Sequence, residues 1–311
     1  MGFEKANQLG KAGVPFLIIV DYKKDNVITI PISELAENDI EFQIDGNVAP
    51  HRNIEFEKFP VRKDIYQKKF QNIIESIKNG YTYVMNLTQP TEIKISSNLK
   101  EIYKFAKAKY KIRFKNSFIS YSPETFIKIE NNQISTFPMK GTISADLPDS
   151  KNELLNNPKE SAEHIMIVDL LRNDLNMVSS KVRVEKFKYI DKIQSGNREL
   201  FQMSSKICGE LESGWESRIG DILETMLPAG SITGTPKIKT VQLIDEIENY
   251  KRGFFTGVFG VFQDGKFDSG VMIRFLENQN GKMVYKSGGG ITLDSNLESE
   301  YQEMIDKIYL F

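Results

Sequence analysis

The sequence is poor in the residues that form cross-links and metal centres. Among 311 residues there is one cysteine, Cys208, and there are two histidines, His51 and His164. A single cysteine excludes an intrachain disulfide and a zinc site built from several cysteines. Two histidines are too few for a histidine-rich metal centre, and we expect His164 to serve in packing or hydrogen bonding. Stability must therefore come from a hydrophobic core, which a chain of this length can bury.

Long apolar runs and an excess of one charge are also missing. The longest apolar run, residues 14–20, is too short to span a bilayer, and the N-terminus lacks the apolar stretch of a signal peptide. The 41 basic residues nearly balance the 42 acidic ones, for a formal net charge of -1. Such a balance creates no long-range field to attract nucleic acid or anionic membrane. We therefore expect a cytoplasmic protein that binds neither.

The pattern of the remaining residues indicates an α+β fold with a large antiparallel sheet system. No linker rich in proline or glycine divides the chain, so we expect residues 1–311 to form one domain. Residues 1–60 are expected to form short strands and turns. Strands are expected at 16–20, 81–87, 126–129 and 134–137, hairpin turns at Asp264-Gly265 and Asn280-Gly281, and helices at 64–79, 98–109, 158–175, 221–226, from Pro236 onward, and 297–309.

A lysine lies within the segment Pro138-Met139-Lys140-Gly141-Thr142. The proline ends a strand and the glycine reduces crowding, so the backbone around Lys140 is fixed. An amine held in a semi-buried cleft is less strongly charged than in water and can act as a nucleophile. The same five residues also fit a surface turn, and the pattern alone favours that second interpretation.

Two expected helices each carry a pair of glutamates on one face. Glu160 and Glu163 are three residues apart near the start of one helix. Glu300 and Glu303 are three apart in the last helix, where Lys307 follows Glu303 at i+4. Acidic first turns and solvated ion pairs explain both patterns structurally. The alternative is that the two helices bring their carboxylates to one Mg²⁺, which typically has one or two carboxylate ligands besides water and substrate oxygens.

Arg274 is expected in a strand that has no polar face. The alternation in residues 271–276 places it between Met272 and Leu276. A guanidinium among apolar neighbours requires an anionic partner, because an unpaired buried charge is costly. A ligand carboxylate can supply it through two hydrogen bonds. An internal acid can do so equally well, and the pattern does not choose between them.

Two glycine-rich segments are candidate anion sites. They are residues 230–237 and the triplet Gly288-Gly289-Gly290. Neither matches a Walker A or a dinucleotide fingerprint. Both can bring backbone N–H groups close to an anion, the first of them at a helix N-terminus. Both are equally compatible with tight turns.

Taken in order along the chain, these segments resemble the chorismate-utilising enzymes, a family that includes the anthranilate, aminodeoxychorismate, isochorismate and salicylate synthases. The resemblance is continuous from about Tyr81 to the C-terminus, whereas residues 1–60 match loosely. So many matches in one order exclude chance. The segments that carry it are Asn86-Leu87, Ser122-Pro123-Glu124, Pro138 to Thr142, Lys159 to His164, 168–170, 172–175, 230–237, 253–257, Arg274, 288–290 and the last helix.

The resemblance implies a fold and a cofactor. The family fold has two packed halves of antiparallel sheet flanked by helices, with the substrate in the cleft between them. The cofactor is Mg²⁺, which acts on the ring carboxylate of chorismate. Glu163 and Glu303 match the metal ligands of the family, and Glu160 and Glu300 match the carboxylates that support them.

The resemblance also assigns residues to the substrate. Glu124 matches the general acid that protonates the departing C4 hydroxyl. Arg274 and the glycine triplet match the groups that hold the enolpyruvyl carboxylate. The full set of expected substrate contacts is Arg274, Gly288, Gly289, Gly290, Thr142, Lys307 and Ser231.

Two positions distinguish branches of the family. Lys140 stands where aminodeoxychorismate synthases carry a lysine and anthranilate synthases typically carry alanine. In that branch the lysine adds to ring C2 as the C4 hydroxyl leaves, and ammonia then enters at C4 and expels it. Val84 stands where isochorismate and salicylate synthases carry a water-activating lysine, which disfavours those branches. Two departures are Gln202, where a histidine is common, and Phe255, where some relatives have tyrosine.

The resemblance therefore predicts amination of chorismate to 4-amino-4-deoxychorismate, a step towards p-aminobenzoate and folate. No segment with a glutaminase-type cysteine is apparent, so a separate glutamine amidotransferase is the expected partner and source of ammonia. Two alternatives remain. One is an anthranilate synthase component I, and the other is an inactive relative that binds chorismate in a regulatory role.

Overall fold

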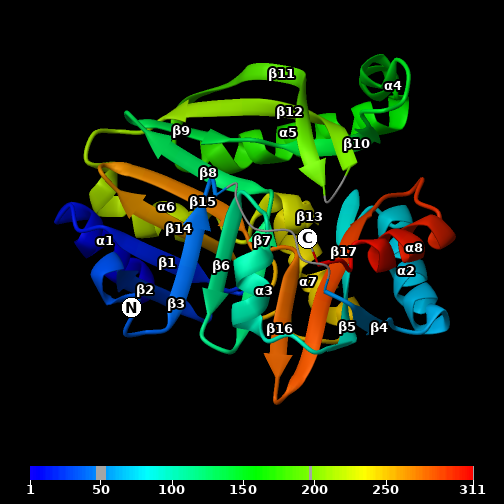
Figure 1. The fold of residues 1–311 in the computed structure, drawn as a ribbon. Helices are drawn as coiled ribbons and strands as arrows, with labels where there is room; N and C mark the ends of the chain where they lie inside the picture. The colour runs from blue at the N-terminus through cyan, green and yellow to red at the C-terminus, as the bar shows by residue number, and fades with distance from the viewer. Residues whose placement is uncertain (47–53, 196–197, 311) are drawn as a thin grey trace.

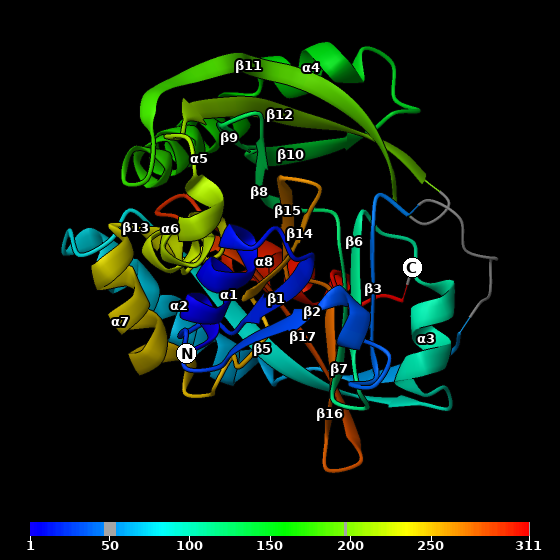
Figure 2. The ribbon, with the colours of Figure 1, turned by 90° about the vertical axis from the view of Figure 1, so that its left-hand side faces the viewer.

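The computed structural model describes residues 1–46, 54–195 and 198–310, so His51 lies outside the described part of the chain. Two antiparallel sheets form the body of the protein, and helices cover their faces and edges (Figures 1 and 2). The predicted α+β class with antiparallel sheets is confirmed.

The first sheet forms the upper and left-hand layers of Figure 1. Its strands follow the order β10-β12-β9-β8-β15-β14-β1-β2, and β11 pairs with β12 outside this path. The bounds are β1 (Phe16–Val20), β2 (Val27–Pro31), β8 (Thr125–Glu130), β9 (Gln133–Thr136), β10 (Met139–Ser144), β11 (Ser180–Ser195), β12 (Arg198–Glu210), β14 (Val258–Gln263) and β15 (Lys266–Val271).

The second sheet lies below and follows the order β13-β5-β17-β16-β7-β6-β3, with β4 paired to β5. Its long central pair joins distant parts of the chain, because Asn86 in β5 lies opposite Gly290 in β17. The bounds are β3 (Ile40–Ile44), β4 (Phe56–Phe59), β5 (Val84–Ile95), β6 (Tyr110–Phe114), β7 (Phe118–Ser122), β13 (Gly234–Thr235), β16 (Phe275–Gln279) and β17 (Lys282–Ile291).

The two helices that carry the site glutamates, α5 and α8, each begin at an asparagine whose side chain caps the helix. The Asn157 side chain accepts from Glu160 N at the start of α5, which has proline at its first position. The Asn296 side chain caps α8 in the same way. The bounds are α1 (Gly2–Lys11), α2 (Lys63–Lys78), α3 (Leu99–Phe105), α4 (Ser150–Asn156), α5 (Pro158–Asn176), α6 (Ile219–Met226), α7 (Lys237–Glu248) and α8 (Leu297–Asp306).

Strand β1 is buried along its whole length because it has a core on each side. Phe16, Ile18 and Val20 belong to a large hydrophobic cluster that includes helix residues such as Leu223 in α6. Leu17 and Ile19 belong to a second cluster that includes side chains of the other sheet. A continuous apolar run is the expected pattern for a strand buried on both faces, and the predicted strand at 16–20 is confirmed.

The chain passes from the first sheet to the second between β15 and β16. Residues 272–274 lie outside both strands, and Arg274 has a left-handed backbone with φ 51°. The prediction that Arg274 alternates with Met272 and Leu276 along one strand is therefore wrong. The residues on both sides of this crossing are buried, so the sequence stays apolar through it. The apolar pattern therefore gives no sign that the strand ends there.

Other local predictions differ from the structure in informative ways. The first ten residues were expected to lack a helix, but α1 packs on α6 through buried Phe3 and Ala6. Strand β5 starts at Val84, three residues later than predicted, and runs on to Ile95. Helix α3 ends at Phe105, since Ala106 is already extended. The predicted turns at Asp264 and Asn280 are present, each with a left-handed residue followed by a left-handed glycine.

None of the helices in the described residues combines the length and the apolar character needed to cross a membrane.

Candidate active site

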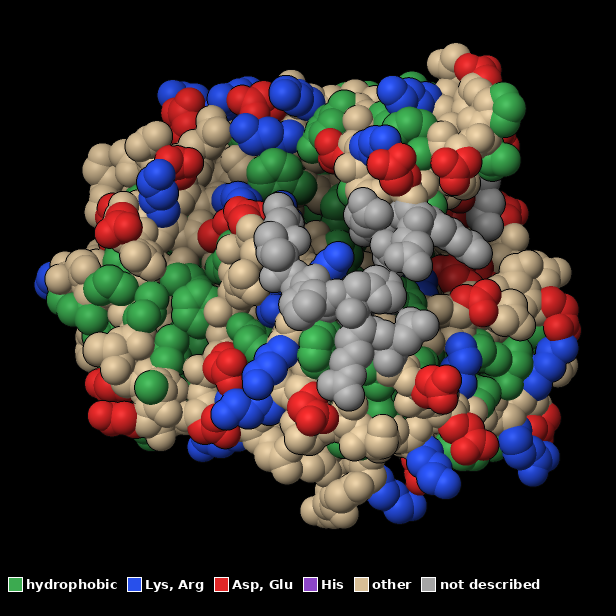
Figure 3. All heavy atoms as spheres, in the orientation of Figure 1, with side chains coloured by type: hydrophobic (Ala, Val, Ile, Leu, Met, Phe, Trp, Pro, Cys, Tyr) green, Lys and Arg blue, Asp and Glu red, His purple; other side chains and the backbone are tan. Residues whose placement is uncertain are grey.

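A cavity of about 570 Å³ lies between the two sheets. Strand β10 and helix α5 form one wall, while β5, β17 and α8 form the other. The face shown in Figure 3 is recessed below the β11–β12 layer. Every site residue expected from the sequence lines this cavity, namely Lys140, Glu124, Arg274, Gly288, Gly289, Gly290, Thr142, Lys307, Ser231, Glu163, Glu303, Glu160 and Glu300.

Lys140 lies in a strand that borders the cavity, not in a turn on the outer surface. It belongs to β10, opposite Met203 of β12. A bulge at Gly141, with φ 71°, follows it. A Cβ at Gly141 would lie 2.8 Å from Glu160 Oε2, which is the end of a flexible side chain, so it is the positive φ of this residue that favours glycine. The Lys140 Nζ reaches Glu163 Oε2 at 3.2 Å, and the side chain is 33% exposed.

The four glutamates approach the cavity from α5 and α8. Glu300 is buried and accepts a hydrogen bond from Ser295 Oγ at 2.7 Å, so it does not lie on a solvated helix face. Glu303 pairs with Lys307 at 2.6 Å. A Cβ at Gly289 would lie 3.4 Å from Glu303 Oε1 and 3.6 Å from Glu300 Oε2. Gly289 of β17 therefore lies close to the α8 carboxylates, at distances that a Cβ could also accommodate.

The donor set suits a hard cation, although the carboxylates are not closed around one point. Within the described ranges, no three carboxylate, imidazole or thiol groups are gathered as a ready-made metal cage. The cavity nevertheless receives two carboxylates from each of two helices, and oxygen donors are what Mg²⁺ prefers. Two of these carboxylates are bridged to lysines, Glu163 to Lys140 and Glu303 to Lys307.

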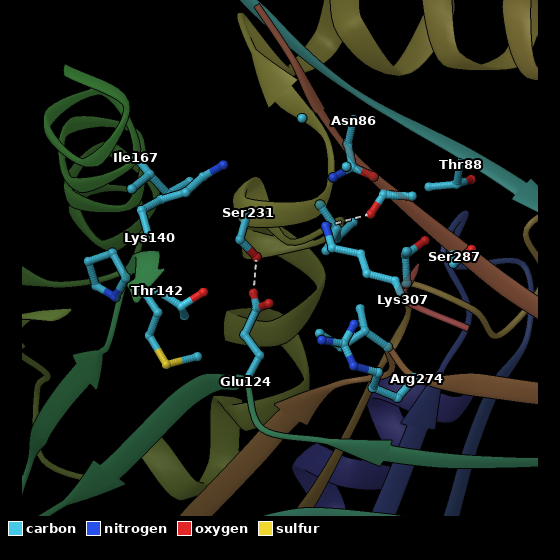
Figure 4. Close-up of a pocket in the computed structure, with 18 of the residues that line it drawn as sticks. Asn86, Thr88, Glu124, Lys140, Thr142, Ile167, Ser231, Arg274, Ser287 and Lys307 are labelled. Carbon is cyan, nitrogen blue, oxygen red and sulfur yellow. Dashed lines mark hydrogen bonds between the residues drawn. The ribbon is translucent and has the colours of Figure 1, made fainter. Parts of the chain in front are cut away.

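Glu124 is a half-buried acid that lines the cavity. It lies between β7 and β8, and its carboxylate accepts a hydrogen bond from the Ser231 hydroxyl (Figure 4). Burial raises the pKa of Glu124, while the Ser231 hydrogen bond and the charges of Lys140, Arg274 and Lys307 act in the opposite direction. A carboxyl group whose pKa is raised stays protonated to higher pH, as a general acid requires.

The opposite wall presents positive charge and backbone groups. Figure 4 shows Arg274 and Lys307 across the cavity from Lys140, with Glu124 between them. Lys307 Nζ donates to Gly288 O at 2.9 Å. The Arg274 Nε donates to the Tyr309 hydroxyl at 2.7 Å, and no carboxylate of the described residues forms an ion pair with this arginine. Of the two partners considered for Arg274, an internal acid is therefore not found.

A smaller cavity of about 40 Å³ adjoins the main one beside Lys140. It shares Lys140, Glu163 and Gly290 with the main cavity. Its remaining lining is mostly apolar and includes Val84 and Met166. A lysine at position 84 would enter this space, so valine leaves the flank of Lys140 without a second amine.

Several cavity residues were not expected from the sequence. Thr88 and Tyr285 line the main cavity, and the hydroxyl of Tyr309 contacts Arg274. Thr88 and Tyr285 lie within strands, and Tyr309 follows the last helix. None of the three belongs to a sequence motif that would mark it as a site residue. Both departures from the family pattern, Gln202 and Phe255, also line the cavity.

Comparison with known proteins agrees with this geometry. Residues 33–311 match the family model described as chorismate binding enzyme. The chain therefore belongs to the family of chorismate-binding enzymes. It is 44% identical over 314 residues to an uncharacterized PabA-like protein of Pasteurella multocida, covering 99% of this chain and 97% of that protein. It is 31% identical over 262 residues to aminodeoxychorismate synthase component 1 of Escherichia coli, covering 79% of this chain and 56% of that protein.

Solved structures with the same fold are also chorismate-utilising enzymes. A putative 2,3-dihydroxybenzoate-specific isochorismate synthase from Bacillus anthracis superposes with a TM-score of 0.73 at 22% identity, covering 98% of this chain and 87% of that one. Anthranilate synthase component I from Streptococcus pneumoniae superposes with a TM-score of 0.70 at 27% identity, covering 84% and 60%. The fold predicted from the family resemblance is confirmed.

Proposed function

We propose that this protein is an aminodeoxychorismate synthase component I, which converts chorismate to 4-amino-4-deoxychorismate. The observation that carries the proposal is the placement of Lys140, whose amine lies inside the cavity beside Glu163 and across from Arg274. Similarity to aminodeoxychorismate synthase component 1 over most of this chain supports it. The chain spans 56% of the Escherichia coli protein, so the assignment of activity rests on the site rather than on overall likeness.

The proposed reaction uses each wall of the cavity. The nitrogen of Lys140 forms a bond to ring C2, while the bond from C4 to its hydroxyl breaks and Glu124 delivers the proton that makes water the leaving group. Ammonia then forms a bond to C4 and the C2–nitrogen bond breaks, which returns the lysine. The net change replaces the C4 hydroxyl with an amino group and releases one water. Arg274 and the backbone of the 288–290 segment hold a substrate carboxylate.

Magnesium is the proposed cofactor, held by Glu163 and Glu303 with Glu160 and Glu300 beside them. When bound, it would supply Lewis-acid and template chemistry at a substrate carboxylate. Glu163 pairs with Lys140 and Glu303 pairs with Lys307, and the two glutamates would exchange these contacts, at least in part, for the ion.

The proposed source of ammonia is a separate glutamine amidotransferase. Such an enzyme needs an accessible thiolate nucleophile, and Cys208 is the one cysteine of the chain. Cys208 is fully buried in β12, where burial raises the pKa of its thiol and it contacts Ser135 and Glu185. These surroundings are unsuited to glutamine hydrolysis. Free ammonium is therefore expected to support turnover when the partner is absent.

Incubation of the protein with chorismate, Mg²⁺ and an ammonium salt tests the proposal directly. We expect mass spectrometry to show a product one mass unit lighter than chorismate, as exchange of hydroxyl for amino requires, with no release of pyruvate. Direct formation of anthranilate would replace the proposal with an anthranilate synthase. Chorismate binding without turnover under any nitrogen source would instead identify an inactive, regulatory relative.

A second prediction concerns the pH profile of the same assay. A general acid acts in its protonated form, so the rate falls as pH rises through the pKa of Glu124. The Ser231 hydrogen bond lowers that pKa. The Ser231→Ala variant should therefore raise it and move the alkaline limb of the kcat profile to higher pH. Glu124→Gln should lower kcat by roughly 10²- to 10⁴-fold and remove that limb. An unshifted limb in Ser231→Ala would assign it to another group.

A further inference from the structure

Tyr309 lies in the C-terminal segment after α8 and contacts the site residue Arg274. Arg274 has a positive φ of 51° at the crossing between the sheets. A left-handed backbone is unfavourable for a residue other than glycine, and it persists only where the surroundings fix it. The contacts that fix Arg274 therefore bear on how it meets a ligand.

Tyr309 supplies two of these contacts. Its hydroxyl accepts from Arg274 Nε at 2.7 Å, and its ring centre lies 4.9 Å from the guanidinium carbon. Tyr121 in β7 holds Tyr309 in turn, because the Tyr121 hydroxyl donates to the Tyr309 carbonyl at 2.6 Å. Tyr309 is thus fixed by the strand of the second sheet that precedes Glu124.

The neighbours of Tyr309 anchor the segment independently of its hydroxyl. Ile308 and Leu310 are buried in a hydrophobic cluster that includes Tyr121 and Tyr285. Lys58 Nζ donates to the carbonyl of Ile305 in the last turn of α8 at 3.1 Å and to the carbonyl of Ile308 at 3.5 Å. Removing one hydroxyl from Tyr309 should therefore leave the segment seated and the protein folded.

The guanidinium atoms of Arg274 that do not contact Tyr309 indicate the role of this tyrosine. Guanidinium donors form a planar fork, and a carboxylate binds bidentately to one edge of it. The Tyr309 hydroxyl accepts the hydrogen bond from Arg274 Nε. Within the described part of the chain, neither Nη atom of Arg274 donates a hydrogen bond to another residue. Arg274 lines the main cavity, so the edge made by its two Nη atoms is the one left for a ligand.

We propose that Tyr309 is a positioning residue that ties down the Nε edge of Arg274 and presents its Nη edge to a carboxylate of the substrate. The inference rests on the proposed function only for the identity of that substrate. It assigns a role in recognition to the end of the chain, beyond the α8 carboxylates and Lys307.

Calorimetric binding of chorismate in the presence of Mg²⁺ tests the proposal without any need for turnover. We expect Tyr309→Phe, which keeps the ring and loses the hydroxyl, to weaken binding about tenfold, as befits a lost hydrogen bond to a charged group. The unfolding temperature should not change. Tyr83→Phe is the matched control, because that side chain is 64% exposed and should bind chorismate as the parent does.

A double-mutant cycle separates positioning from a general structural effect. Arg274→Lys keeps the charge but lacks Nε, so Tyr309→Phe should cause no further loss of affinity in that background. An equal loss in both backgrounds would overturn the proposal, and so would unchanged affinity in the single variant. In the amination assay, Tyr309→Phe should raise KM at unchanged kcat. Failure of amination with these binding results intact would refute the proposed reaction and leave the role of Tyr309 standing.

Discussion

Replacing Lys140 with alanine is expected to abolish amination of chorismate while chorismate binding persists. The amine of Lys140 is the proposed nucleophile, and loss of a nucleophile typically costs about 10⁴-fold or more in kcat. Binding should survive because Arg274 and the glycine segment lie on the opposite wall of the cavity. The measurements are kcat with a saturating ammonium salt and the chorismate Kd by calorimetry.

The control for this experiment is Lys181→Ala. Lys181 also pairs with a glutamate, Glu210 at 2.6 Å, but its side chain is 73% exposed and lies outside the cavity. Its loss should leave both kcat and Kd as in the parent. Amination at the parent rate by Lys140→Ala would show that no covalent bond to Lys140 is needed. It would also remove the main support for assigning the chain to the aminodeoxychorismate synthases.

Replacing Glu248 with glutamine is expected to lower the free energy of unfolding far more than the loss of an exposed ion pair does. Glu248 and Arg252 are each 1% exposed and form an ion pair at 2.6 Å. The glutamate also accepts from Thr88 N at 2.7 Å. Arg252 donates to the carbonyls of Asn86 and Ile232, so the pair joins β5 to the turn that carries Ser231. Removing one partner leaves a buried charge uncompensated, which typically costs about 3–5 kcal/mol of unfolding free energy.

Urea unfolding followed by tryptophan fluorescence measures this loss, because the single tryptophan, Trp215, is buried in the main core. The matched control is Asp169→Asn, which removes a pair with Arg172 whose side chains are about half exposed. Exposed pairs contribute at most about 1 kcal/mol. Similar midpoints for the two variants would show that the buried pair adds no more to stability than a surface one.

Local chemistry in the sequence predicts several elements well. Helix α5 was expected at 158–175 and spans Pro158–Asn176, because a capping asparagine and a proline mark its start. The turns at Asp264-Gly265 and Asn280-Gly281 were predictable because these residue types accept the left-handed backbone that tight hairpins require. In each case the determining interactions lie within a few residues of one another.

Predictions that depend on distant contacts are less successful. The hairpin of β11 and β12 was not foreseen, since shifts in register between the two strands interrupt a regular alternation. The position of Arg274 depends on where the chain changes sheets, which the neighbouring apolar residues do not reveal. The pairing of Lys140 with Glu163 and the role of Tyr309 arise only when β10, α5 and the C-terminal segment meet.

The candidate site was identified from the family resemblance more than from residue patterns. Alone, the pattern around Lys140 favoured a surface turn, and the glutamate pairs had plain structural explanations. The structure places these residues in one cavity, which no single motif required. A site whose residues lie in many separate segments can be recognised in a sequence only from the order of those segments along the chain.

The pairing of β5 with β17 has a consequence for biosynthesis. During synthesis β5 leaves the exit tunnel well before its partner strand β17 and helix α8. Until then the nascent chain carries an unpaired strand edge, which invites association with other chains. Closure of so distant a contact is slow. The cleft is therefore incomplete, and its full set of substrate contacts is not assembled, until β17 and α8 have been synthesised.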